Sequence, residues 1–252
     1  MESYLVYIAG STPASRYAAG LLEASGISTI DHPSPEVTHL LLDVPSFGQD
    51  GALRGGGDVG RLLAMLPPEI TVLGGNLNHS ALSGYRLMDL MQDPGYVAEN
   101  AAITADCAIR VAGERLPVVF RDCPILIIGW GRIGKCLGQM LKALGAEVTV
   151  GARKESDRAM LSALGYETVD TAEMDRILPG FRVIFNTAPE AVLSEEALRR
   201  CSGCLKIDLA SQRGLQGEDV IWARGLPGIH APESSGALIG KQVLAFLREE
   251  RE

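Results

Sequence analysis

Short apolar runs alternate with segments of helical periodicity along the first hundred residues. The apolar runs predict strands at residues 4–8, 28–30, 40–44 and 70–73, and the periodic segments predict helices at residues 15–25, 61–66 and 84–91. Strands that alternate with helices are typical of a parallel sheet covered by those helices. We therefore expect residues 1–95 to form a small flavodoxin-like or Rossmann-like domain that binds substrate or a partner.

Two segments of this half have a different pattern. Residues 46–60 are rich in glycine and predict either a flexible surface connection or a loop that covers a substrate. Residues 96–111 contain many alanines and few helix breakers, which favours one long helix. We expect this helix, taken as residues 96–115, to link the first domain to a second one.

The rest of the chain repeats the alternation more regularly. Strands are predicted at residues 125–128, 147–150, 168–169, 183–186 and 205–209, with a possible sixth at 220–223. Helices are predicted between them, at residues 134–144, 156–164, 170–178 and 194–200. The fold class expected is α/β, with two doubly wound parallel-sheet domains. The second, residues 96–232, is a Rossmann dinucleotide-binding domain, and an amphipathic helix at 233–252 packs back at the domain junction.

A G-x-G-x-x-G motif follows the strand at 125–128 and opens the next helix. The first glycine permits the tight turn, the second lets a pyrophosphate approach the backbone, and the third lets the helix pack close to the strand. Free N–H groups at the helix N-terminus favour phosphate. The motif therefore predicts a dinucleotide site, and its cofactor-binding residues are Gly129, Trp130, Gly131, Arg132, Ile133 and Gly134. A structural turn without a ligand is the alternative.

The end of the second strand indicates which dinucleotide binds. NAD-binding proteins commonly carry a carboxylate there for the ribose 2′-hydroxyl, but this chain has Arg153 and Lys154 instead. Arginine and lysine suit a 2′-phosphate, and Ser156 offers a further hydroxyl. We therefore expect NADP(H) as the cofactor. The alternative is that the two cations lie in a solvated turn.

Two more strand ends face the same edge of the sheet, where ligands of this fold bind. The exit of the fourth strand, with Asn186, Thr187, Ala188 and Pro189, is expected beside the cofactor. The fifth strand closes with Asp208, and we expect its exit, residues 208–214, near the nicotinamide and the substrate. A structural acceptor of nearby N–H groups is the alternative for Asp208.

Composition narrows the class of protein. A net charge of −8 argues against a nucleic-acid surface, and no apolar run reaches the roughly 20 residues that span a bilayer. The first residues show no basic leader, so we expect a cytoplasmic protein. Five cysteines, including a lone C-x-x-C at Cys201 and Cys204, do not make a metal-ligand set with the four histidines. We expect no metal.

Several stretches between residues 84 and 240 resemble the family of the A-type subunit of dipicolinate synthase, within the formate/glycerate dehydrogenase-like group. No single stretch is decisive, but their order and spacing are specific. The stretches are Glu99-Asn100-Ala101-Ala102-Ile103-Thr104-Ala105, Ile127-Ile128-Gly129-Trp130-Gly131-Arg132, Gly151-Ala152-Arg153, Asn186-Thr187-Ala188-Pro189, Ile207-Asp208-Leu209-Ala210-Ser211 and Gly225-Leu226-Pro227-Gly228-Ile229-His230-Ala231-Pro232, together with Tyr85, Asp89 and Leu90.

The resemblance implies an NADPH-linked subunit that works with a flavoprotein-like B-type subunit in the mother cell of sporulating bacteria. It implies formation of pyridine-2,6-dicarboxylate from a cyclic intermediate of the lysine pathway. A dicarboxylate substrate needs cations, for which Arg16 and Arg213 are candidates, although each could be an ordinary surface arginine. Ring aromatisation needs a base and a hydride acceptor. His230, in a Gly/Pro-rich loop after the last strand, is the best candidate for the base, and a histidine with a purely structural role in that loop is the alternative.

Asn100, Thr104 and Ser211 could orient the substrate or the nicotinamide amide, although Thr104 could equally pack within a helix. The first domain is expected to be shorter than in the family, and Arg16 of this chain is the one candidate to stand in for the family's loop arginine. A second function therefore stays open, namely a non-catalytic NADP-binding subunit that regulates or scaffolds a partner. In either case we expect a homo-oligomer.

Overall fold

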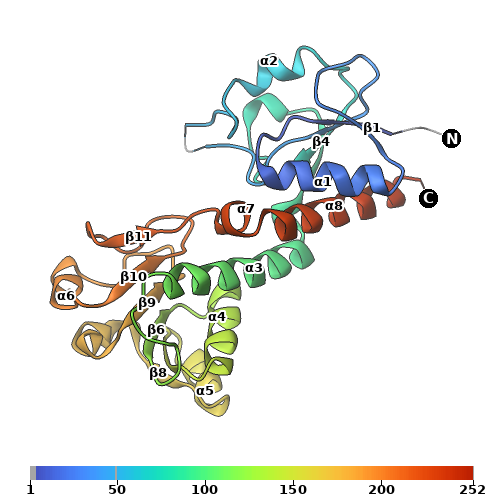
Figure 1. The fold of residues 1–252 in the computed structure, drawn as a ribbon. Coiled ribbons are helices and arrows are strands. Elements are labelled where there is room, and N and C mark those ends of the chain that lie inside the picture. The colour runs from blue at the N-terminus through green and yellow to red at the C-terminus, as the bar shows by residue number, and fades with distance from the viewer. Residues whose placement is uncertain (1–3, 49, 252) are drawn as a thin grey trace. The chain divides into compact units, whose positions relative to one another are not determined.

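The computed structural model describes residues 4–48 and 50–251, which form two compact units (Figure 1). The first unit contains the segment up to Asn100 together with the segment from Pro227 onward. The second unit contains Ala101–Leu226. Each unit is built on one parallel sheet, so the predicted α/β class with two doubly wound domains is confirmed. The division differs from the predicted one, because the C-terminal helix is part of the first unit.

The sheet of the first unit has the order β2-β1-β3-β4-β5, and all its strands are parallel. Its strands are β1 (Leu5–Ile8), β2 (Ser28–Ile30), β3 (His39–Leu41), β4 (Thr71–Gly74) and β5 (Arg86–Asp89). Its helices are α1 (Pro13–Ala24), α2 (Val59–Leu63), α8 (Pro232–Glu249) and the short 3-10 helices η1 (Ser80–Leu82) and η2 (Leu90–Gln92). The helix α3 (Pro94–Gly113) continues from this unit into the second, and α7 (Leu226–His230) returns from it.

One predicted helix of the first unit is wrong. The segment at 84–91 forms strand β5 and the start of η2, because residues 86–89 pair in parallel with Thr71–Gly74 of β4. In so short a segment, the stabilisation from backbone hydrogen bonds to a neighbouring strand outweighs the preference for a helix that the periodicity indicates.

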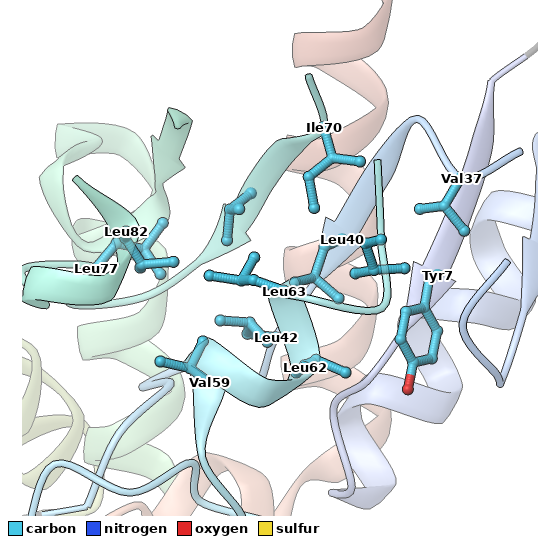
Figure 2. Packing of buried hydrophobic residues seen from close by; sticks show 12 residues of the cluster. Tyr7, Val37, Leu40, Leu42, Val59, Leu62, Leu63, Ile70, Leu77 and Leu82 are labelled. Carbon is cyan, nitrogen blue, oxygen red and sulfur yellow. The ribbon is translucent and has the colours of Figure 1, made fainter. Parts of the chain in front are cut away.

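Apolar side chains from the strands and α2 form the core on one face of this sheet. Leu40, Leu42 and Val72 are fully or almost fully buried there, and Val59, Leu62 and Leu63 of α2 pack against them (Figure 2). The glycine-rich loop adds Phe47 and Leu53 to the edge of this cluster. The Phe47 ring stacks on His79 with their centroids 4.7 Å apart. The described part of this loop is therefore packed on the unit, and whether it covers a substrate stays a prediction.

Helix α8 joins the first unit because its small residues let it approach α1 closely. A Cβ on Gly236 would lie 2.4 Å from the Ala14 carbonyl oxygen, and one on Gly240 would lie 2.9 Å from Leu21 Cδ2. Beyond the end of α8, Glu250 accepts a hydrogen bond from His39 Nε2 at 2.9 Å and pairs with Arg86. Burial lowers the pKa of His39, so a neutral ring donates this bond.

A buried carboxylate fixes the turn after β1. Asp43 accepts hydrogen bonds from the backbone N–H and hydroxyl groups of Ser11 and Thr12, and from Ser15 Oγ at 2.7 Å. Burial by itself raises the pKa of Asp43, but these hydrogen bonds favour the charged form and the net effect is a lowered pKa. The carboxylate thereby holds the start of α1 at the carboxyl end of β3.

The sheet of the second unit has the order β11-β10-β9-β6-β7-β8 and is also entirely parallel. Its strands are β6 (Pro124–Ile128), β7 (Glu147–Gly151), β8 (Glu167–Val169), β9 (Val183–Asn186), β10 (Leu205–Asp208) and β11 (Val220–Trp222). Its helices are α4 (Arg132–Ala143), α5 (Glu155–Ala163), α6 (Glu195–Arg200) and the 3-10 helices η3 (Thr171–Arg176) and η4 (Leu178–Gly180).

Two helix predictions in this unit need correction. Residues 171–180 form the two 3-10 helices in place of the predicted α-helix. Helix α5 starts at Glu155, one residue before the predicted start, and its N-cap is Lys154, which makes no side-chain capping hydrogen bond. The strand order changes direction between β6 and β9, which is where ligands bind at the carboxyl edge of such sheets. Among the described residues, no helix is both long and apolar enough to cross a membrane.

Candidate functional site

The turn between β6 and α4 has the geometry that its three glycines predict. Gly129 has a φ of +97°, a conformation that residues with a Cβ rarely adopt. A Cβ on Gly134 would lie 2.3 Å from the Gly129 carbonyl oxygen, so only glycine lets α4 pack this close to the turn. Gly131 has no atom within 4 Å of its Cβ position. The backbone at Gly131 is therefore open to a ligand.

The N-terminus of α4 is free of side-chain competitors for its N–H groups. Gly131 is the N-cap and has no side chain to accept their hydrogen bonds, and the first turn contains no acidic residue. Arg132 and Gly131 are exposed and Ile133 is half-buried. A helix N-terminus of this kind attracts phosphate through its N–H groups and its dipole.

Trp130 lies over the helix that the turn introduces. Its ring meets Tyr166 edge-on, with centroids 5.4 Å apart, and a Cβ on Gly138 would lie 3.2 Å from its Cζ3 atom. Lys142 Nζ lies 4.3 Å from the centroid of the Tyr166 ring. The indole is half-buried and borders the cavity described below. A ligand bound in that cavity should therefore change the fluorescence of Trp130.

The end of β7 presents two exposed cations on a fixed backbone. Arg153 and Lys154 are exposed. Arg158 of α5 donates to the Ala152 and Arg153 carbonyl oxygens, both at 2.8 Å, and forms a 2.9 Å ion pair with Asp170. Arg158 is a positioning residue that the sequence pattern did not single out. A basic side chain in the first turn of the helix that follows a strand is the pattern that could have identified it.

The exit of β9 is held by hydrogen bonds of its own side chains. Asn186 Nδ2 donates to the Ala188 carbonyl oxygen at 2.9 Å, and Asn186 Oδ1 accepts from the Ala188 N–H at 3.1 Å. Thr187 Oγ1 donates to the Ile128 carbonyl oxygen at 2.9 Å and lies against Gly129. Asn186 is fully buried, whereas Pro189 is exposed. These contacts fix the loop beside the glycine turn.

Asp208 is fully buried and accepts four hydrogen bonds from protein donors. It accepts from Asn186 Nδ2 and the Ala210 N–H at 3.0 Å, and from the Gly214 and Leu215 N–H groups at 2.7 Å and 2.8 Å. This arrangement matches the structural role that the sequence left open. The carboxylate connects the ends of β9 and β10 with the following loop.

Six of the predicted cofactor residues line one cavity of about 220 Å³ at this edge of the second sheet. Three strand ends contribute them in pairs: Gly129 and Trp130, Arg153 and Lys154, and Ala188 and Pro189. The remaining predicted residues surround this set: Gly131, Arg132, Ile133 and Gly134 continue the turn into α4, Asn186, Thr187 and Asp208 support the loops, and Ser156 is exposed on α5.

Two carboxylates border the same cavity and were not among the predicted residues. Asp157 comes from the first turn of α5, and Glu190 directly follows Pro189. Glu190 Oε2 lies 3.4 Å from Arg153 Nη1, and both side chains are largely exposed. The position of Glu190 one residue beyond the predicted exit loop was the available signal.

The predicted substrate and catalytic residues are divided between the units. Arg16, Asn100 and His230 belong to the first unit, and Thr104, Ser211 and Arg213 belong to the second. Arg213 donates to the carbonyl oxygens of Leu215 and Gly217, at 3.0 Å and 2.6 Å. His230 ends the short helix α7, where the sequence predicted a loop.

The surroundings of these residues differ. Arg16 borders a cavity with Pro13, Tyr17 and Pro232. Thr104 is buried within α3, whereas Ser211 is exposed.

The C-x-x-C pair has a buried lysine as its neighbour. Cys201 is the C-cap of α6, and Cys204 precedes β10, as predicted. Burial, reinforced by Cys201, raises the pKa of the Cys204 thiol. Lys206 is fully buried and donates to the Cys201 carbonyl oxygen at 2.8 Å, and it also pairs with Asp219. In the described part of the chain, no group of three or more His, Cys, Asp or Glu side chains could hold a metal ion.

Comparison with known proteins gives relatives in sequence and in structure. No protein-family model matches the chain. The A-type subunit of dipicolinate synthase from Bacillus subtilis is 27% identical over 181 residues, which are 68% of this chain and 61% of that protein. The match therefore spans about three fifths of the length of this curated relative. A probable multifunctional siroheme biosynthesis protein HemA of Ruminiclostridium josui is 30% identical over 101 residues, 38% of this chain and 20% of that protein.

Among solved structures, the A-type subunit of dipicolinate synthase from Bacillus halodurans has a TM-score of 0.81 at 21% identity, covering 97% of both chains. A transhydrogenase from Sinorhizobium meliloti has a TM-score of 0.71 at 13% identity, covering 98% of this chain and 94% of the other. The chain is thus a homologue of the A-type subunit of dipicolinate synthase, whose fold it shares.

Proposed function

We propose that this homologue of the A-type dipicolinate synthase subunit is an NADP(H)-dependent oxidoreductase. The observation that carries the proposal is the cavity lined by the glycine turn, the Arg153–Lys154 pair and the β9 exit loop. These are the three parts that hold a dinucleotide in this fold, and they come from strands on both sides of the point where the strand order reverses. The oxidoreductase class is also supported by the sequence similarity to dipicolinate synthase and by the structural likeness to a transhydrogenase.

The residues present fit such a cofactor. The open backbone at Gly131 and the uncapped first turn of α4 would hold the pyrophosphate, and Arg153 with Lys154 would hold the 2′-phosphate. When bound, the nicotinamide would supply hydride transfer. Preference for NADP(H) over NAD(H) rests on the two cations and on the absence of an acidic residue at the end of β7.

The reaction we propose follows the similarity to dipicolinate synthase. It removes water and two hydrogens from a cyclic intermediate of the lysine pathway to form pyridine-2,6-dicarboxylate. Arg16 and Arg213 would bind the carboxylates, and His230 would take the proton released on aromatisation. Asn100, Thr104 and Ser211 would orient the reacting groups. A flavoprotein-like B-type subunit is the proposed partner, because the relative is one subunit of a synthase.

Cofactor binding tests the first part of the proposal. We expect NADPH to quench the Trp130 emission with a lower Kd than that of NADH. Arg153→Gln should weaken NADPH about tenfold and NADH little, since one charge-assisted phosphate contact is lost. Arg199→Gln is the matched control, because Arg199 is an exposed, ion-paired arginine of the same unit that does not border the cavity. Equal or tighter binding of NADH would refute the NADP preference.

Turnover tests the second part. The purified chain is mixed with the cyclic lysine-pathway intermediate and NADP, with and without a candidate B-type subunit, and nicotinamide absorbance is followed. Production of NADPH together with pyridine-2,6-dicarboxylate supports the proposed reaction. Tight NADPH binding without turnover in any combination supports the alternative, a non-catalytic subunit that regulates or scaffolds a partner.

A further inference from the structure

We infer that Glu190 moderates cofactor specificity by competing with a 2′-phosphate for Arg153. This inference rests on the proposed dinucleotide function of the same cavity and adds a residue to it. Glu190 and Arg153 are 37 positions apart in the sequence, yet Glu190 Oε2 lies 3.4 Å from Arg153 Nη1. Both residues line the cavity whose other walls are the glycine turn and the β9 exit loop.

Both members of this pair stand on supported backbone. On the arginine side, Arg158 donates to the carbonyl oxygens of residues 152 and 153, and the start of α5 follows directly. The position of the Arg153 main chain is therefore set independently of Glu190.

On the glutamate side, the hydrogen bonds of buried side chains hold the loop that carries Glu190. Asn186 bonds both the N–H and the carbonyl oxygen of Ala188, and Asp208 in turn accepts from Asn186. Gly214 lies so close that a Cβ there would be 2.9 Å from the Glu190 carbonyl oxygen and 2.7 Å from that of Ala188. The two side chains are largely exposed, while the main chains that carry them are held in place at the border of one cavity.

The charges decide what the pair does. A 2′-phosphate requires the Arg153 guanidinium, which already has a carboxylate partner, so binding must exchange one anion for another. Glu190 would also remain near the phosphate and repel it. An uncharged ribose hydroxyl meets neither cost. Glu190 therefore lowers the affinity for NADP(H) relative to NAD(H) and moderates the preference that Arg153 and Lys154 create.

Glu190→Gln is the direct test. The variant removes the charge but keeps the length of the side chain. An exposed ion pair contributes up to about 1 kcal/mol, which is about fivefold in Kd. We expect the Kd for NADPH to fall about threefold to fivefold and that for NADH to change less than twofold. The effect should shrink at about 1 M salt, where the Debye length is about 3 Å.

Two further variants make the test specific. In an Arg153→Gln background, Glu190→Gln should change the Kd for NADPH less than it does in the parent chain, because the competition for Arg153 is gone and only the direct repulsion of the phosphate remains. Glu195→Gln is the matched control: Glu195 pairs with Arg199 at 3.3 Å in the same unit but does not border the cavity, so neither Kd should change. Urea midpoints equal to that of the parent chain establish that each variant is folded.

The outcomes separate this inference from the function on which it rests. If NADPH binds but Glu190→Gln leaves the ratio of the two Kd values unchanged, the inference is overturned and the proposed function stands. If Glu190→Gln weakens NADH, Glu190 instead accepts a hydrogen bond from the ribose hydroxyl, and the competition is overturned. If neither cofactor binds the parent chain or any variant, the proposed function fails first.

Discussion

Replacing Asp208 by alanine removes the shared acceptor of four donors at the end of β10. The carboxylate accepts bonds of 2.7–3.0 Å from one side-chain amide and three backbone N–H groups, and it is fully buried. A buried donor left without an acceptor costs about 1–3 kcal/mol. The four costs are not additive, since the loop can relax and admit water. We expect the second unit to lose about 3–5 kcal/mol of its free energy of unfolding.

Asp208→Asn refines this expectation. The amide keeps one oxygen, which can still serve two donors, but it points N–H groups at the other two. We therefore expect this variant to lose about half as much stability as Asp208→Ala, roughly 2 kcal/mol.

The assay uses the position of the two tryptophans. Trp130 and Trp222 both lie in the second unit, so the change in tryptophan emission with urea follows that unit alone. Trp222 Nε1 also donates to the Ala210 carbonyl oxygen at 3.2 Å, beside the bonds that Asp208 makes. Asp106→Asn is the control, because Asp106 is half-exposed in an i,i+4 pair with Arg110 and should cost less than about 1 kcal/mol.

One result would refute the reasoning about Asp208. If Asp208→Ala unfolds at the urea concentration of the parent chain but no longer binds NADPH, the carboxylate serves the ligand and not the loop. Loss of stability with cofactor binding retained in the folded fraction supports the structural role.

Two further predictions concern other residues whose surroundings the structure resolves. Gly131→Ala should cost less than about 1 kcal/mol of stability but weaken NADPH binding about tenfold or more, whereas Gly134→Ala should destabilise the second unit by about 1–3 kcal/mol. The reason is that only the Cβ on residue 134 would meet a protein atom, at 2.3 Å. Urea midpoints and NADPH titrations test both variants, and an equal loss of stability would contradict the distinction. Because the pKa of Asp43 is lowered on folding, the contribution of this carboxylate to stability is present above its unfolded pKa of about 3.9 and is lost as pH falls through its folded pKa. Asp43→Asn should therefore be less stable than the parent chain by about 2–3 kcal/mol near neutral pH, and this difference should narrow in acid. Hydrogen exchange in peptides of the first unit measures it, and a gap independent of pH would contradict the linkage.

The strand-and-helix alternation and the glycine turn could be predicted from the sequence because their causes are local. Buried strands of a parallel sheet require continuous apolar runs, such as residues 125–128. The spacing of Gly129 and Gly134 reflects a positive φ and a close approach within six residues of chain. The two cations at the end of β7 could be read from the sequence for the same reason.

Only the tertiary structure decided the features that depend on distant partners. Residues 86–89 form a strand because β4 offers an edge, and α8 joins the first unit because Gly236 and Gly240 fit against α1. The role of Asp208 depends on N–H groups six and seven residues away and on Asn186. Glu190 and Arg153 lie on two loops 37 residues apart in the sequence, and no local pattern predicts that these side chains meet. Local periodicity specifies elements, but the partners of a charge are set by how those elements pack.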